Sequence, residues 1–260
     1  MRIRFQRVGV CAAVSAALIP AHAQTTKPAS SSAGAFDHSP FDALLKQHFK
    51  ADGNVDYEGL QRDAAALDGY VAAIGAAPYD TLGRDEQMCL LINAYNAFTL
   101  RLILDHWPLK SIRDIPESKR WDDGRWKIGP MTLSLNQIEN DYLRPKFNEP
   151  RIHFAVNCAS VGCPPLRAEA YVPARLEQQL QEQAERVNRD PRWVRFDAKS
   201  GVLKLTPLYD WYGADFKAAT GSVEAYVARF NPNLNAALQS KWTVTIEWLD
   251  YDWSVNAAAR

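Results

Sequence analysis

The chain has 260 residues, of which 47% are hydrophobic and 23% are charged, and its 30 basic residues balance its 30 acidic residues. Proteins that bind nucleic acid or an anionic membrane surface normally carry a basic face, so this balance argues against both kinds of partner. Apolar and aromatic residues are dense from residue 37 to residue 256, without an internal linker or repeat, which predicts one domain with a single core.

Residues 1–23 have the pattern of a secretory signal peptide. A basic start, an apolar run and a cleavage site follow one another: Arg2–Arg7, Val8–Ile19 and Ala21–Ala23. The apolar run is shorter than the roughly twenty residues that span a bilayer, so we expect cleavage and no membrane insertion afterwards. Its removal leaves 27 basic and 30 acidic residues, a net charge of −3. The predicted location is the periplasm or the extracellular medium.

The segments that flank the domain are predicted to be disordered. Residues 24–36 are mostly small and polar and read as a tether, and residues 257–260 read as a short tail. The domain itself is therefore predicted to extend over residues 37–256.

The clearest predicted helix covers residues 85–106. It is apolar almost all round, which is typical of a buried central helix. Asn93 and Asn96 lie one turn apart on the same face, and they need hydrogen-bond partners if they are buried. We regard both as candidate binding residues.

Residues 121–143 are expected to form short strands and then a helix. Residues 121–126 suggest a hairpin over an Asp-Gly turn, and a second turn at Gly129-Pro130 precedes a short strand. Ser134 and Gln137 have the spacing of a capping box at a helix start. Glu139 falls inside the apolar stripe of that helix. It is expected either to pair with a buried cation such as Arg151 or to serve as a general acid or base with a raised pKa, and ion pairs are the commoner arrangement.

The richest chemical segment, residues 151–165, reads RIHFAVNCASVGCPP. Residues 152–157 predict a buried strand, in which His153 and Asn157 face one side and Cys158 the other. A surface helix over residues 173–187, a hairpin of residues 193–197 and 202–206, short helices and a half-buried strand over residues 241–249 follow. Helices mixed with antiparallel hairpins, without a βαβ rhythm, predict an α+β fold around the buried helix.

Several runs resemble the DUF547-type domain family. They are DEQMCLLINAYNAFTL, MTLSLNQIENDYLRP, RIHFAVNCASVGCPPL, LYDWYGADF and YDWSVN, in the order that the family has them. The family carries a placeholder name, so the resemblance implies an exported single-domain protein in bacteria and no secure activity. Where family members often have a histidine after the glutamate, this chain has Asn140 after Glu139.

Cys158 is the candidate nucleophile, since a thiolate paired with a histidine is a common catalytic arrangement. His153 is the best base, and Glu139, Asn93, Asn157 or Asp215 are candidates to orient it. A dyad needs the predicted strand to end or bulge at Asn157. This reading predicts a hydrolase or acyltransferase acting on amide or ester bonds.

The alternative is a non-catalytic envelope module stapled by a Cys158–Cys163 disulfide, with Cys89 as a buried free thiol. Its partner would be an envelope peptide, glycan or protein. Asn157, Trp211 and Asp215 are candidate binding residues, although most of the eight tryptophans are expected in the core. The sequence has no metal-ligand spacing and no phosphate-binding glycine loop, so no metal or cofactor is expected.

Overall fold

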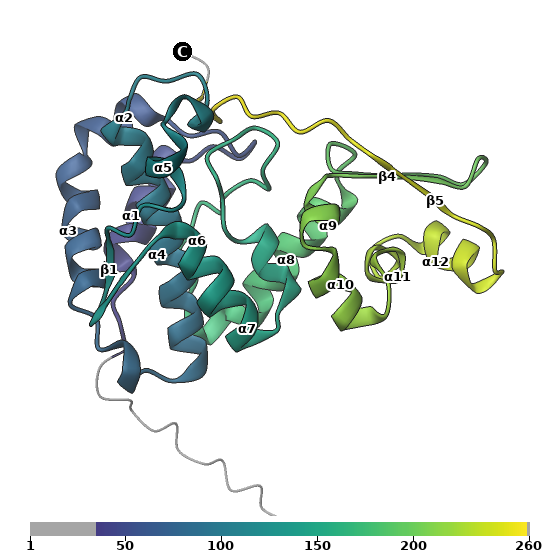
Figure 1. Ribbon diagram of the computed structural model, residues 1–260, viewed down its shortest axis with the longest axis horizontal. Helices are drawn as coiled ribbons and strands as arrows, with labels where there is room; N and C mark the ends of the chain where they lie inside the picture. Colours follow the sequence, from purple (N-terminus) through teal and green to yellow (C-terminus); the bar gives the residue numbers. More distant parts are fainter. Residues whose placement is uncertain (1–34, 259–260) are drawn as a thin grey trace, which may run out of the picture. The chain divides into compact units, whose positions relative to one another are not determined.

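The computed structural model describes residues 35–258. The predicted signal peptide and nearly all of the predicted tether lie outside this range. Within it, helices are combined with a two-stranded and a three-stranded sheet, which confirms the predicted α+β class (Figure 1).

The long helix α4 (Arg84–Asp105) is buried along almost its whole length, as predicted. It is the one helix among residues 35–258 that is long and apolar enough to cross a membrane, yet 94% of its apolar window is buried inside the fold. It packs against α3 (Ala64–Gly75), and α1 (Ser39–His48) packs on α3 in turn (Figure 1). The helix is therefore the centre of the buried core.

Short elements connect this helical layer to the rest of the chain. They are α2 (Tyr57–Arg62), η1 (Tyr79–Thr81), η2 (Ile112–Asp114) and α5 (Glu117–Arg120). The hairpin expected over residues 121–126 is wrong. Strand β1 (Trp126–Ile128) instead pairs with β2 (Met131–Leu133) across the Gly129-Pro130 turn. Gly129 has a φ of +55°, and a Cβ there would lie 2.5 Å from the carbonyl oxygen of Ala77, so the turn requires glycine.

The helix predicted from Ser134 consists of α6 (Leu135–Gln137), the π-helical turn η3 (Ile138–Leu143) and α7 (Arg144–Phe147). The capping box is present: Gln137 N donates to Ser134 Oγ at 3.1 Å, and Ser134 N donates to Gln137 Oε1 at 2.9 Å. Single π-helical turns inside helices are frequent at functional sites because they shift side chains out of the regular helical positions.

The strand predicted over residues 152–157 is wrong. Residues Pro150–Phe154 form the 3₁₀ helix η4, in which Pro150 occupies the start and Glu149 Oε1 accepts a hydrogen bond from Arg151 N at 3.0 Å. Proline with a preset φ and a side-chain cap favour a helical start over a strand, and this local chemistry outweighs the apolar pattern. The alternating faces expected for His153 and Cys158 therefore do not apply.

The remaining elements build a second core. They are α8 (Leu176–Arg189), β3 (Val194–Asp197), β4 (Val202–Leu205), α9 (Leu208–Trp211), α10 (Gly213–Thr220), α11 (Val223–Ala228), α12 (Pro232–Gln239) and β5 (Thr245–Trp248). The short 3₁₀ helix η5 (Pro173–Arg175) directly precedes α8 and has no buried residues. The predicted β3–β4 hairpin is confirmed, and β5 pairs with β4 in parallel, an arrangement that the sequence did not predict (Figure 1).

After β5 the chain returns to the helical layer, where single bridges join Ser254 to Ser111, Val255 to Ser160 and Ala257 to Val55. Ala258 N also donates to Val55 O at 2.8 Å. The first two residues of the predicted disordered tail are thus hydrogen-bonded to the domain, and Phe36 at the other end packs against the core.

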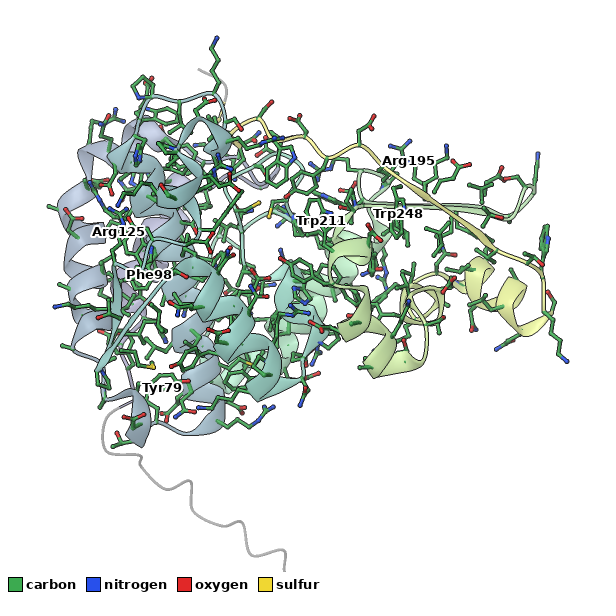
Figure 2. The ribbon with its side chains drawn as sticks, in the orientation of Figure 1. Tyr79, Phe98, Arg125, Arg195, Trp211 and Trp248 are labelled. Carbon is green, nitrogen blue, oxygen red and sulfur yellow. The ribbon has the colours of Figure 1, made fainter. Side chains whose placement is uncertain are left out.

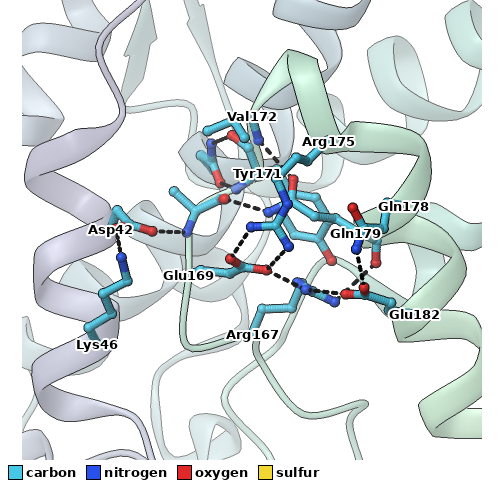
Figure 3. A network of polar contacts seen from close by, with 12 residues as sticks. Asp42, Lys46, Arg167, Glu169, Tyr171, Val172, Arg175, Gln178, Gln179 and Glu182 are labelled. Carbon is cyan, nitrogen blue, oxygen red and sulfur yellow. Dashed lines mark hydrogen bonds and ion pairs between the residues drawn. The ribbon is translucent and has the colours of Figure 1, made fainter.

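A polar network holds the segment between Pro165 and α8 in place (Figure 3). Arg167 binds Glu182 at 2.7 Å and also contacts Glu169, which pairs with Arg175 at 2.8 Å. Asp42 Oδ1 of α1 accepts from Ala170 N at 3.0 Å. This network ties α1 and α8 to the loop that follows the two neighbouring cysteines.

Candidate functional site

A pocket of about 190 Å³ lies where the π-helical turn, the segment after η4, α9 and the C-terminal segment meet. Polar groups of Glu139, His153, Cys158 and Cys163 line its inner part. Aromatic side chains surround them: Tyr95, Trp121, Trp211, Tyr212, Tyr251 and Trp253. The structure therefore brings the three candidate catalytic residues to one cavity.

The sulfur of Cys158 is surrounded by hydrogen-bonding groups. Its Sγ lies 3.1 Å from Ser160 Oγ and 3.1 Å from the hydroxyl oxygen of Tyr251. Hydrogen bonds from Cys163, Ser160 and Tyr251 lower the pKa of the Cys158 thiol to about 7, against the opposing effect of burial. Cys158 is half-buried and faces the pocket, so this side chain is suited to be a thiolate near neutral pH.

Cys163 has the opposite character. Burial and the neighbouring Cys158 raise the pKa of its thiol well above the usual value. Its Sγ accepts a hydrogen bond from Cys158 N at 3.2 Å. The three cysteines within residues 35–258 are all free thiols, so the expected Cys158–Cys163 disulfide is not formed in this structure, and Cys89 is buried as predicted.

Asn157 shapes the turn that carries Cys158. Its Oδ1 accepts from Ala159 N at 2.7 Å, and its Nδ2 donates to Pro164 O at 2.7 Å. Ala159 takes a left-handed conformation, with a φ of +58°, which this side-chain contact helps to hold. Asn157 is buried and is not among the residues that line the pocket, and its hydrogen bonds stabilise the loop.

Asn93 and Asn96, two further candidate binding residues, both bond the backbone. Asn96 Oδ1 accepts from Asn157 N at 2.9 Å, while its Nδ2 donates to Ala155 O at 2.9 Å. Asn93 makes the same pair of bonds to the backbone of Tyr171, at 2.8 and 3.0 Å. Both are buried away from the pocket, and they fix two loops to the central helix.

The C-terminal segment, residues 251–255, is hydrogen-bonded to residues 158–163, which we call the cysteine loop. Val161 N donates to Ser254 O and Gly162 N donates to Asp252 O, each at 2.8 Å. A Cβ at Gly162 would lie 2.8 Å from Asp252 N, so only glycine allows this close approach. The same pairing places Tyr251 beside Cys158.

His153 is held between two carboxylates. Its Nε2 lies 2.8 Å from Asp215 Oδ2, and its Nδ1 lies 3.4 Å from Glu139 Oε1 without making a hydrogen bond. Asp215 also receives two hydrogen bonds from Arg144, at 2.7 and 3.0 Å. Hydrogen bonds from His153 and Arg144 hold the pKa of Asp215 well below its usual range. Tyr212 stacks on the imidazole with ring centroids 3.8 Å apart.

This arrangement changes two expectations. Glu139 faces His153 and not Arg151, which pairs instead with Glu149 at 2.6 Å and Glu177 at 2.8 Å. The polar contacts described for His153 and Cys158 do not join the two side chains. The Cys–His dyad predicted from the sequence is thus replaced by a thiol held by hydroxyl groups and a histidine held by carboxylates.

Trp211 lines the pocket and is 46% exposed; its side chain, at the end of α9, is labelled in Figure 2. Its ring lies against Tyr251 and Trp253, with centroids 4.9 and 5.9 Å away. Sequence reasoning included Trp211 and missed Tyr251, Trp253 and Ser160. One signal was present: the tripeptide Tyr-Asp-Trp occurs at residues 209–211 and again at 251–253, and three of its four aromatic side chains, Trp211, Tyr251 and Trp253, line the pocket.

No group of three or more His, Cys, Asp or Glu residues within residues 35–258 is arranged to hold a metal ion. The chemistry that the described residues themselves offer is nucleophilic attack by a thiolate, with a carboxylate and an aromatic surface nearby.

Residues 79–186 match a family model described as "Protein of unknown function, DUF547". This part of the chain is therefore similar to the DUF547 family. Searches among curated proteins and among solved structures each found no match.

The DUF547 match includes α4, the π-helical turn, η4 and both neighbouring cysteines. Asp215, Trp211 and Tyr251 lie beyond it, yet they complete the surroundings of His153 and Cys158. The pocket is therefore built by the DUF547 segment together with residues of the C-terminal third of the chain.

Proposed function

We propose that the protein is an exported, thiol-dependent hydrolase or acyltransferase that uses Cys158 on ester or amide bonds. The observation that carries the proposal is the Cys158 sulfur, which faces a pocket while hydroxyl, thiol and backbone donors surround it. A buried structural cysteine has no need of such donors, because its neutral thiol packs as a small apolar group.

In the proposed reaction, the Cys158 thiol first gives its proton to solvent, and the thiolate attacks the acyl carbonyl carbon. The bond from the acyl carbon to the alcohol or amine breaks, the leaving group takes a proton from solvent, and a thioester remains on Cys158. Water or a second nucleophile then attacks the thioester carbonyl and releases the thiolate. Glu139 is the carboxyl group that lines the pocket, and we assign it the role of taking the proton from that nucleophile.

His153 is a positioning residue in this scheme. Asp215 fixes its Nε2, and Tyr212 covers its ring, so its remaining nitrogen faces Glu139. The Cys158 thiolate needs no histidine base because its hydrogen-bond donors already favour ionisation.

The competing proposal is a non-catalytic envelope module, and the exposed Trp211 at an aromatic rim favours it. Flat aromatic faces bind peptide side chains or sugar rings without any reaction. The two proposals differ in whether a covalent intermediate forms at Cys158.

A covalent capture experiment separates them. The processed chain is mixed with p-nitrophenyl acetate or an aryl thioester, quenched in acid and examined by intact mass and peptide mapping. An enzyme gives a burst of released phenol or thiol and an acyl group on Cys158; Cys158→Ala abolishes both, and the buried Cys89→Ser control keeps them. Absence of an acyl group on Cys158, in protein shown to be folded by circular dichroism, contradicts the proposal.

A further inference from the structure

Cys158 and Cys163 form an asymmetric pair of thiols. Both line the pocket, but Cys158 is half-buried whereas Cys163 is only 6% exposed. The Cys158 N–H donates a hydrogen bond to Cys163 Sγ at 3.2 Å, so the second sulfur lies against the backbone that carries the first. A reagent that enters the pocket therefore has better access to the sulfur of Cys158 than to that of Cys163, and both thiols belong to the same pocket.

The loop between the two cysteines is already closed without a disulfide. Cys163 N donates to Ser160 O at 3.1 Å, and Asn157 Nδ2 bonds Pro164 O at 2.7 Å across the loop. Trp193 Nε1 donates to Gly162 O at 3.1 Å, and the C-terminal segment holds Val161 and Gly162. Because the fold already holds the two cysteines in one closed loop, with Cys163 Sγ 3.2 Å from Cys158 N, bond formation between the sulfurs needs little further loss of chain entropy.

We propose that Cys158 and Cys163 are a dithiol–disulfide couple that exchanges with disulfides of small thiols or of exposed protein cysteines. The inference rests on the proposed function only in using Cys158 as the attacking thiolate. It adds a second class of substrate, the disulfide bond, and assigns Cys163 as the resolving thiol.

The reaction transfers two electrons from the protein dithiol to the substrate disulfide. The Cys158 thiolate attacks one sulfur of RS–SR, forming a Cys158–S–S–R mixed disulfide while the RS–SR bond breaks and RS⁻ leaves. Cys163 gives its proton to a leaving thiolate, and its sulfur attacks Cys158 Sγ. The Cys158–Cys163 bond then forms, the second RS⁻ departs, and the protein dithiol is oxidised as the substrate disulfide is reduced.

This order follows from the surroundings of each sulfur. Cys158 has the donors that stabilise a thiolate, and the buried Cys163 remains a thiol until the mixed disulfide removes the negative charge beside it. Oxidation would also consume the proposed acyl-accepting nucleophile, so the acyl chemistry would stop while the disulfide persists.

The test uses glutathione disulfide on the processed chain carrying Cys89→Ser, so that only the pair can react. The parent protein should lose two alkylatable thiols and retain no glutathione, and dithiothreitol should restore both. Cys163→Ser should accumulate a one-to-one glutathione adduct on Cys158 that persists at least tenfold longer than in the parent. Cys158→Ser should do neither, and Cys163→Ala with circular dichroism checks that the effect is not one of unfolding.

If the glutathione adduct lasts as long on the parent protein as on Cys163→Ser, the proposed dithiol–disulfide couple is overturned. A parent that takes up an acyl group from p-nitrophenyl acetate but is inert to glutathione disulfide also overturns it and leaves the proposed function standing. Inertness to both reagents overturns the two proposals together.

Discussion

The Nε2 atom of His153 lies 2.8 Å from Oδ2 of Asp215, and its Nδ1 faces Glu139, so the imidazole is directed at carboxylates and not at the Cys158 sulfur. In a Cys–His–Asp triad the carboxylate orients a histidine whose other nitrogen contacts the nucleophile. Here the hydroxyl groups of Ser160 and Tyr251 occupy the place of that histidine.

Asp215→Asn tests this distinction. Loss of a partly buried carboxylate shared by His153 and Arg144 should lower the free energy of unfolding by about 2 kcal/mol. The rate at which iodoacetamide modifies Cys158 should change less than about threefold, because the histidine is not the base of the thiol. The exposed Asp210→Asn serves as the control in denaturant unfolding and in site-resolved alkylation. A fall in the alkylation rate of a hundredfold would instead indicate a triad.

Tyr251→Phe should weaken the thiolate. The change removes one hydroxyl group 3.1 Å from Cys158 Sγ, and the loss of one hydrogen bond of roughly 1.4 kcal/mol corresponds to a rise of about one unit in the pKa of Cys158. Alkylation of Cys158 at pH 7 should then slow several-fold and recover at pH 9. Tyr142→Phe, outside the pocket, should leave the alkylation rate unchanged. Equal rates in the two variants would show that the Tyr251 hydroxyl does not stabilise the Cys158 thiolate.

Asn96→Ala should destabilise the fold and loosen the cysteine loop. Both polar atoms of the buried side chain bond the backbone at Ala155 and Asn157, so truncation leaves two buried groups without partners. We expect a loss of about 2–4 kcal/mol in unfolding free energy, measured in urea. The exposed Asn235→Ala in α12 should cost less than about 0.5 kcal/mol. If Asn96→Ala lowers the free energy of unfolding as little as the control does, the proposed stabilising role of the Asn96 hydrogen bonds is contradicted.

The buried His38, which lies outside the pocket, should make the stability of the fold sensitive to acid. Burial lowers its pKa from 6.5 to about 4, so the folded state resists protonation that the unfolded state accepts. The associated stability is fully present above about pH 6.5 and is lost as the pH falls toward 4, by up to about 3 kcal/mol. The side chain in His38→Gln does not titrate but can still bond the Tyr70 hydroxyl. This variant should be less stable at pH 7, and its free energy of unfolding should change less between pH 7 and pH 4. Parallel slopes in both proteins would exclude His38 as the cause.

The sequence was informative where local chemistry dominates. The apolar run of α4, the Ser134–Gln137 capping box and the β3–β4 hairpin follow from periodicity and turn residues, and all are present. The stretch around His153 was misread because the apolar pattern of residues 152–157 resembles a strand, whereas Pro150 and the Glu149 cap impose a 3₁₀ helix.

The surroundings of Cys158 depend on contacts far apart in the chain. Tyr251 is 93 residues away, and it reaches the sulfur only because residues 252–255 pair with the cysteine loop. Likewise, no spacing rule predicts that His153 meets Asp215 across 62 residues. Candidate residues could therefore be chosen by chemical type, but their partners required the tertiary structure.

The most direct test of the account is the rate of Cys158 alkylation as a function of pH, resolved by peptide mass in the processed chain. The account predicts a rate that rises with a midpoint near pH 7, while Cys163 and the buried Cys89 stay unreactive throughout, because hydrogen bonds favour the Cys158 thiolate and burial protects the other two thiols. A midpoint near the ordinary thiol value of about 8.5 would contradict the activated thiolate and with it both proposals for this pocket.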